Sequence, residues 1–104
     1  MDTNGPSQGC RNGVTERPEN GTFRFVNIVH FDELEVELKV EKGRNVERIV
    51  ITSNGETIHT VPDVKAGRRT VTFAAEDATA FDIAVLNDDG MVIDTAQFYS
   101  RCSP

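Results

Sequence analysis

The stretch AFDIAVLNDDGMVIDTAQFY, residues 80–99, predicts a β-hairpin at the centre of the fold. Asp-Gly between two apolar runs is a strong hairpin signal. Phe81, Ile83 and Val85 recur at every second position, so an extended strand places them on one face. The second run leads almost directly into Cys102. We therefore expect strands at 80–87 and 91–99, and we expect this hairpin to be part of the core.

The clearest alternation in the chain lies further upstream, where Leu34, Val36, Leu38 and Val40 are separated by charged residues. One apolar and one polar face are typical of an antiparallel sheet with a single covered side. Glu, Leu and Lys also favour a helix. A helix, however, scatters these four aliphatic residues around its axis, whereas a strand collects them on one face. The pattern therefore favours a strand.

Strand patterns recur along the rest of the chain, separated by turn signals. Asn54-Gly55 is a second hairpin signal. In the first strand the apolar positions change face near Asn27, which predicts a β-bulge. The predicted strands comprise residues 22–29, 33–41, 46–53, 56–61, 69–75, 80–87 and 91–99. This pattern predicts an all-β fold, a seven-stranded antiparallel, immunoglobulin-like Greek-key sandwich.

One passage resembles a known kind of module. VKAGRRTVTF, residues 64–73, resembles a passage of CARDB-like and fibronectin-III-like modules of archaeal and bacterial cell-surface proteins, and residues 82–90 are similar to the strand and turn that follow it. The resemblance covers roughly residues 23–99 and implies an immunoglobulin-like sandwich at a cell surface. Two features depart from the immunoglobulin pattern: the chain has no Trp, and its two cysteines do not lie in two core strands.

The N-terminal 21 residues differ in composition from the rest of the chain. They hold four Gly and one aliphatic residue of the kind that is usually buried, Val14, which predicts an arm rather than a strand. We therefore divide the chain into an arm, residues 1–21, and a sandwich domain, residues 22–104. Cys10 and Cys102 flank the folded region, and their spacing favours one disulfide that tethers the arm. Closing a loop of this length stabilises a protein by as much as about 4 to 5 kcal/mol.

The expected disulfide also predicts that the protein is exported, because disulfides persist in oxidising compartments. Asn20-Gly21-Thr22 matches the acceptor triplet for N-glycosylation, which also favours an extracellular or cell-surface location. No stretch approaches the roughly 20 apolar residues of a membrane span. The N-terminus lacks the features of a signal peptide. Either the signal is absent from this sequence, or the protein is intracellular with two free thiols.

The charge of the chain restricts its partners. The formal net charge is −6, which argues against a nucleic-acid partner because phosphates need a clustered basic surface. The basic residues comprise eight Arg and three Lys, against 17 Asp and Glu. Such a composition suits a halophilic source, where hydrated carboxylates maintain solubility. An acidic protein from a GC-rich genome fits equally well.

Each candidate chemical site is weak. Asp88 and Asp89 offer oxygen ligands for Ca²⁺, with Asn87 beside them and Glu76 and Asp77 in a neighbouring loop, but turn geometry explains the same residues. The two histidines are too few for a zinc site. The serines lack a nucleophile motif, the acidic row of 33–41 is a solvated strand face, and the arginine pair is exposed. These weak candidates are His30, His59, Ser53, Ser100, Ser103, Glu33, Glu35, Glu37, Glu41, Arg68 and Arg69. We expect no enzymatic activity and no cofactor.

The absence of a catalytic constellation favours an exported structural or interaction module, such as a cell-surface or pilus-like filament subunit. Its partner is then another copy or another surface protein, joined through a sheet edge. The candidate edge strand consists of Glu56, Thr57, Ile58, His59, Thr60 and Val61. The alternative is an extracellular recognition module that binds a protein or glycan through its end loops, for which Phe31 and Tyr99 are the candidate exposed rings.

Overall fold

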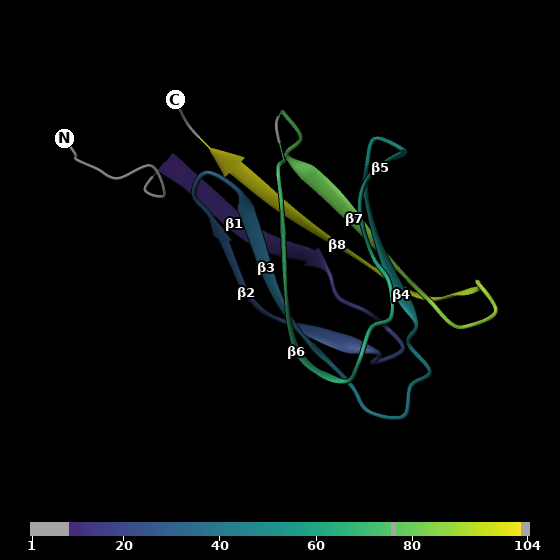
Figure 1. Cartoon of the computed structure of the whole chain (residues 1–104). Coiled ribbons are helices and arrows are strands. Elements are labelled where there is room, and N and C mark those ends of the chain that lie inside the picture. Colours follow the sequence, from purple (N-terminus) through teal and green to yellow (C-terminus); the bar gives the residue numbers. More distant parts are fainter. Residues whose placement is uncertain (1–8, 76, 103–104) are drawn as a thin grey trace.

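The computed structural model describes residues 9–75 and 77–102, which form two antiparallel β-sheets (Figure 1). The strands are β1 (Cys10–Glu16), β2 (Phe23–His30), β3 (Leu34–Val40), β4 (Arg48–Ser53), β5 (Glu56–Val61), β6 (Gly67–Phe73), β7 (Ala80–Leu86) and β8 (Val92–Cys102). One sheet has the strand order β1-β8-β7-β4-β5 and the other the order β2-β3-β6. The described residues include no helix that is long and apolar enough to cross a membrane. The all-β prediction is therefore confirmed.

The predicted count of seven strands is not confirmed, because the described residues form eight. Residues 10–16, expected to belong to an arm, form β1 and pair antiparallel with β8 in the larger sheet. The sequence of β1 is polar and has no apolar alternation, so it does not predict a strand. The segment is extended because its backbone pairs with the edge of β8. Gly13 also lies opposite Tyr99, where a Cβ atom would meet the tyrosine ring at 2.6 Å. The first eight residues of the expected arm lie outside the described residues.

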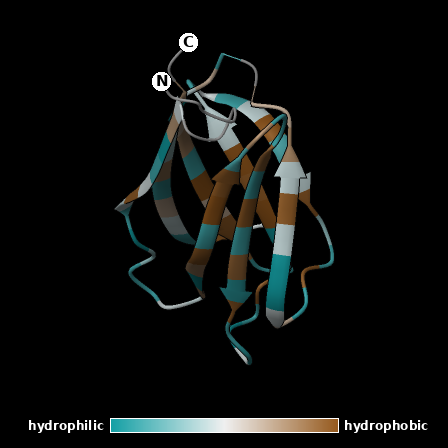
Figure 2. Cartoon of the chain, turned by 90° about the vertical axis from the view of Figure 1, so that its left-hand side faces the viewer, coloured by the Kyte–Doolittle hydropathy of each residue, from teal (hydrophilic) through white to brown (hydrophobic). Residues whose placement is uncertain are grey.

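The core lies between the two sheets and follows the predicted alternation (Figure 2). Leu34, Val36 and Leu38 are fully buried, and so are the inward residues of β4 and β7. Phenylalanine rings take the place of the missing tryptophan: Phe81 stacks on Phe98 with ring centroids 5.0 Å apart. Burying one such ring contributes about 1.5 to 3 kcal/mol.

Both predicted hairpins are present. Asn54 and Gly55 have φ angles of 54° and 79°, as the tight turn between β4 and β5 requires. Asn87 organises the turn between β7 and β8, because its Oδ1 atom accepts hydrogen bonds from the backbone N–H groups of Asp89 and Met91, both at 3.0 Å. The predicted bulge near Asn27 is also confirmed, since the register of β2 against β3 shifts between Phe25 and Asn27.

The two lateral sides of the molecule differ. On one side the edge strands β1 and β2 lie close together, and a hydrogen bond of 3.2 Å joins the side chain of Asn12 to the backbone of Ile28. On the other side the edge strands β5 and β6 have few contacts with each other. We call these the stapled side (β1 and β2) and the open side (β5 and β6).

Candidate functional site

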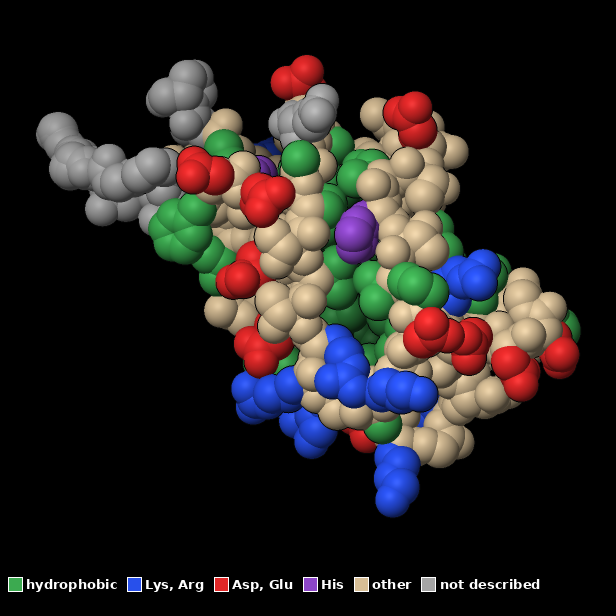
Figure 3. All heavy atoms as spheres, in the orientation of Figure 1, with side chains coloured by type: hydrophobic (Ala, Val, Ile, Leu, Met, Phe, Trp, Pro, Cys, Tyr) green, Lys and Arg blue, Asp and Glu red, His purple; other side chains and the backbone are tan. Residues whose placement is uncertain are grey.

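The open side contains a groove of about 690 Å³ between β5 and the segment that follows β6. Ile58 and His59 line it from β5, and Phe73, Ala74 and Ala78 line it from the opposite side. Figure 3 shows this hollow with apolar side chains along it and a histidine at its margin. Polar residues make up most of the lining, among them Asn54, Glu56 and Asp77, so the groove offers a small apolar surface with a polar surround beside a sheet edge.

His59 has a packing role at this groove. Its ring stacks on Phe73 with centroids 5.7 Å apart and planes inclined by 13°. Phe73 is buried and contacts Phe81 in the core at a centroid distance of 5.9 Å. The half-buried histidine therefore covers the outermost part of the phenylalanine core. Among the described residues, His59 belongs to no group of potential metal ligands.

The candidate edge strand has the bounds that the sequence predicts, Glu56–Val61, and it forms the outer strand of the larger sheet. Its register against β4 shifts between Ile51 and Thr52, which places a bulge at Ile58. Bulges also interrupt β1 at Thr15 and β2 at Val26. The fourth edge strand, β6, pairs with β3 without any shift. Bulges discourage further strand pairing, so β6 is the most regular edge in the described part of the chain.

At the stapled side the predicted disulfide joins Cys10 of β1 to Cys102 of β8 within the larger sheet, across a sequence separation of 92. A polar cluster lies beneath it. The Ser100 hydroxyl donates to Asn12 Oδ1 at 2.6 Å, and His30 Nδ1 lies 2.8 Å from Ser100 Oγ. The sequence analysis did not predict the contact between Asn12 and Ser100. The only signal for it is that Ser100 occupies an inward-facing position of β8, directly opposite Asn12 on β1.

The same cluster brings three potential metal ligands together. One ligand atom each from Cys10, His30 and Cys102 lies within 4.8 Å of the others, and Cys102 Sγ is 3.3 Å from His30 Nδ1. A soft metal binds thiolates. Since the two sulfur atoms are bonded to each other, the oxidised protein has no thiolate to offer at this position.

The glycosylation candidate lies in the connection between β1 and β2. Asn20 is exposed, and its side-chain amide donates to the carbonyl of Ile93 at 2.8 Å. The buried carboxylate of Asp94 accepts hydrogen bonds from the Thr22 hydroxyl at 2.8 Å and from the Thr22 backbone at 3.2 Å. Arg44 donates to the Asn20 carbonyl. The triplet thus has a structural role, and its glycosylation stays a prediction.

The calcium candidates Asp88 and Asp89 are exposed at the β7–β8 turn. The backbone of this turn is held by the Asn87 side-chain oxygen, and among the described residues these carboxylates belong to no group of three potential ligands. Asp77 is exposed in another loop, and Glu76 lies outside the described residues.

The weak catalytic candidates are spread over the molecule. Ser53 donates to the Ala80 carbonyl at 2.7 Å, Ser100 belongs to the stapled side, and Ser103 lies outside the described residues. Glu33, Glu35 and Glu41 are exposed and Glu37 is half-buried beside Arg68. Arg69 donates to the carbonyls of Ala66 and Arg68.

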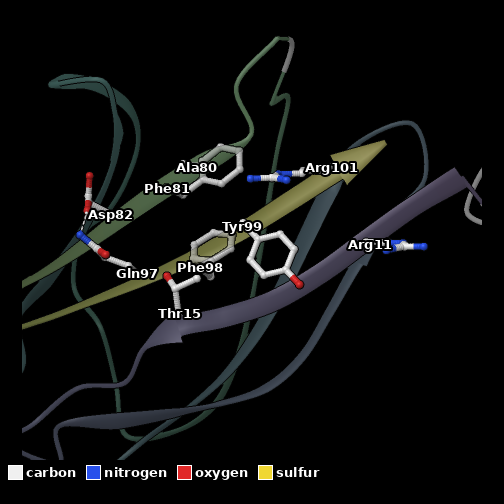
Figure 4. A pocket seen from close by; sticks show the side chains of 9 residues that line it. All are labelled: Arg11, Thr15, Ala80, Phe81, Asp82, Gln97, Phe98, Tyr99 and Arg101. Carbon is white, nitrogen blue, oxygen red and sulfur yellow. Dashed lines mark hydrogen bonds between the residues drawn. The ribbon is translucent and has the colours of Figure 1, made fainter. Parts of the chain in front are cut away.

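A second hollow, of about 460 Å³, lies on the outer face of the larger sheet. Figure 4 shows the Tyr99 ring over β1, with Arg101 and Arg11 nearby. The Arg101 guanidinium carbon is 5.8 Å from the centroid of the Tyr99 ring. The other candidate ring, Phe31, is 58% exposed in the β2–β3 turn. The structure therefore places Tyr99 on a sheet face rather than in an end loop.

Comparison with known proteins gives no match: no protein-family model, no curated protein and no solved structure is similar to this chain.

Proposed function

We propose that this chain is an exported, non-catalytic assembly module, a cell-surface or pilus-like filament subunit whose open side binds a second copy. The observation that supports this best is the asymmetry between the sides. A disulfide, a polar cluster and a hydrogen bond fasten β1 to its neighbours, whereas β5 and the segment after β6 flank a groove in which Ile58, Phe73 and Ala74 lie among polar residues. A groove beside a regular sheet edge suits an extended segment, which adds backbone hydrogen bonds while its side chains fill the hollow.

The immunoglobulin-like Greek key belongs to the same proposal. The chain crosses between the sheets after β1, β3, β5 and β6, while the hairpins β2–β3, β4–β5 and β7–β8 each stay within one sheet. This order supports a seven-stranded Greek-key unit, β2 to β8, to which β1 is added at the edge of β8. The disulfide supports export, because such bonds persist in oxidising compartments.

The test of the assembly is a substitution in the groove. Ala74→Lys places a charged chain in the hollow, while Thr95→Lys places the same charge on an exposed position of the other sheet and serves as the control. The measurement is the mass in solution by light scattering against concentration, at about 1 M salt, where the Debye length is about 3 Å. The wild type and the control should associate and Ala74→Lys should not. A wild type that stays monomeric, or an Ala74→Lys variant that associates equally well, overturns the proposal.

A second candidate function rests on the Tyr99 hollow. The hollow combines the Tyr99 ring, with Arg101 near its face, and a second cation, Arg11, along its lining. Such a lining fits a ligand that has both a flat face and an acidic group, such as an acidic sugar. Tyr99→Ala should remove binding of glucuronate-containing oligosaccharides in calorimetry. If the wild type gives no binding heat, the recognition function fails at this hollow.

A further inference from the structure

The register of the smaller sheet places three cations in a row. Arg24 on β2 lies opposite Lys39 on β3, and Lys39 lies opposite Arg68 on β6. Their chain neighbours Phe23 and Leu38 are buried, so the three charged side chains occupy the outer face. Neighbouring strands are about 4.8 Å apart. The row therefore concentrates three positive charges on a protein whose net charge is −6.

This row is unfavourable for the isolated molecule. Like charges directly opposite each other on neighbouring strands are destabilising, each pair by about 0.2 to 1 kcal/mol. Arg68 is partly compensated by Glu37, 3.1 Å away. Within residues 9–75 and 77–102, Arg24 and Lys39 make no ion pair and no side-chain hydrogen bond. Two of the three cations are thus available to an external anion.

The opposite end of the same face is acidic. Glu35 on β3 and Asp32 and Glu33 in the β2–β3 turn are exposed, and the exposed ring of Phe31 lies beside them. Figure 3 shows basic side chains toward the lower end of β3 and β6 and acidic side chains toward the upper left. The sheet therefore has a positive end and a negative end on one surface.

We infer that a second copy of this chain docks on this face with its strands running in the opposite direction. A two-fold axis between the two sheets then places the cationic row of each copy on the acidic end of the other. The contact is isologous, so its charge complementarity is satisfied twice. A free polyanion fits less well, because Glu37 and Glu35 share the outer face of β3 with Lys39 and lie beside the row.

This inference rests on the proposed assembly function and adds a second contact to it. If the open side also pairs two copies symmetrically, two different two-fold contacts alternate along an open chain, whereas one of them alone gives only a closed dimer. The two surfaces lie on different parts of the molecule, the outer face of the β2-β3-β6 sheet and the β5/β6 edge groove. Each contact can therefore be removed while the other remains.

The experiment is a charge exchange. The first variant carries Arg24→Glu and Lys39→Glu, and the second carries Glu33→Lys and Glu35→Lys. Both are made together with Ala74→Lys, so that the open-side contact is absent and the mass in solution reports the charged face alone. Matched controls reverse two charges elsewhere: Arg11→Glu with Arg48→Glu, and Asp88→Lys with Asp89→Lys. All four positions of these controls are exposed and lie in the larger sheet or in its β7–β8 turn.

The parent with Ala74→Lys should dimerise at about 0.01 M salt and dissociate at about 1 M, as the Debye length falls from about 30 Å to about 3 Å. Each charge-reversed variant alone should dissociate at least about tenfold more readily, the sum of a few exposed pairs of about 0.2 to 1 kcal/mol each. An equimolar mixture of the two variants should recover the dimer, and the controls should behave like the parent.

Three results overturn the inference. The first is a parent that is monomeric at low salt, and the second is a variant that dimerises as the parent does. The third is a mixture that fails to recover, combined with binding of polyglutamate by the parent, which would assign the row to a polyanion. Circular dichroism spectra check that each variant is folded. Concentration-dependent association of the wild type at high salt tests the open side separately, so failure of this inference is distinct from failure of the assembly function.

Discussion

The stapled side and the open side are both formed by two edge strands, but they differ in how those strands are held and in how regular they are. On the stapled side a disulfide fastens the edge strand β1 to β8 within its own sheet, and a hydrogen bond from Asn12 joins β1 to β2. The bulges at Thr15 and Val26 break the regularity of both edge strands. On the open side a groove with a mixed polar and apolar lining lies between β5 and the segment after β6, and β6 keeps an unbroken register. Under the proposed assembly function, the stapled side supports stability and the open side supports association. Mutations on the stapled side should therefore lower the free energy of unfolding, and mutations on the open side should weaken association.

The largest expected effect on stability is the loss of the staple. Replacing Cys10 and Cys102 by serine should lower the free energy of unfolding by about 3 to 4 kcal/mol, since the bond closes most of the chain into one loop. Urea denaturation measures the change, and the wild type in a thiol reductant is the control. An unchanged midpoint for both would show that β1 is held by its strand pairing alone, and the contrast between the sides would disappear.

A smaller effect is expected at the connection between the two stapled strands. Asp94→Ala removes a buried carboxylate that accepts from the Thr22 backbone and hydroxyl, and should cost about 2 to 3 kcal/mol. Asp82→Ala is the matched control, because Asp82 is exposed and accepts a single side-chain hydrogen bond, from Gln97 at 2.8 Å. That change should cost under about 0.5 kcal/mol. Equal losses in thermal denaturation would mean that burial does not distinguish the two carboxylates.

The smallest stability effect is expected on the open side. His59→Ala removes one ring stack at a half-buried position and should cost about 0.5 to 1.5 kcal/mol. The same change should nevertheless weaken association at high salt, because His59 lines the groove. Light scattering and urea denaturation on one sample separate the two effects. A large loss of stability without any loss of association would reverse the roles assigned to the two sides.

The sequence predicts the inner faces well, because burial imposes a period of two that is visible in residues 34–40 and 80–86. The tight turns follow from Asn54-Gly55 and Asn87 to Gly90 for local reasons. β1 escapes prediction because its strand is stabilised by a partner some 80 to 90 residues away, not by its own apolar pattern. The cationic row is not predictable from the sequence for the same reason, because only the register of three strands brings Arg24, Lys39 and Arg68 together.

The position of the disulfide also determines how the protein transmits force. Cys10 and Cys102 face each other at the start of β1 and the end of β8. Tension applied to chain that enters before Cys10 and leaves after Cys102 passes directly through the sulfur–sulfur bond. The residues between the cysteines then carry none of the force. Stretching the chain therefore does not unfold the domain while the disulfide is intact.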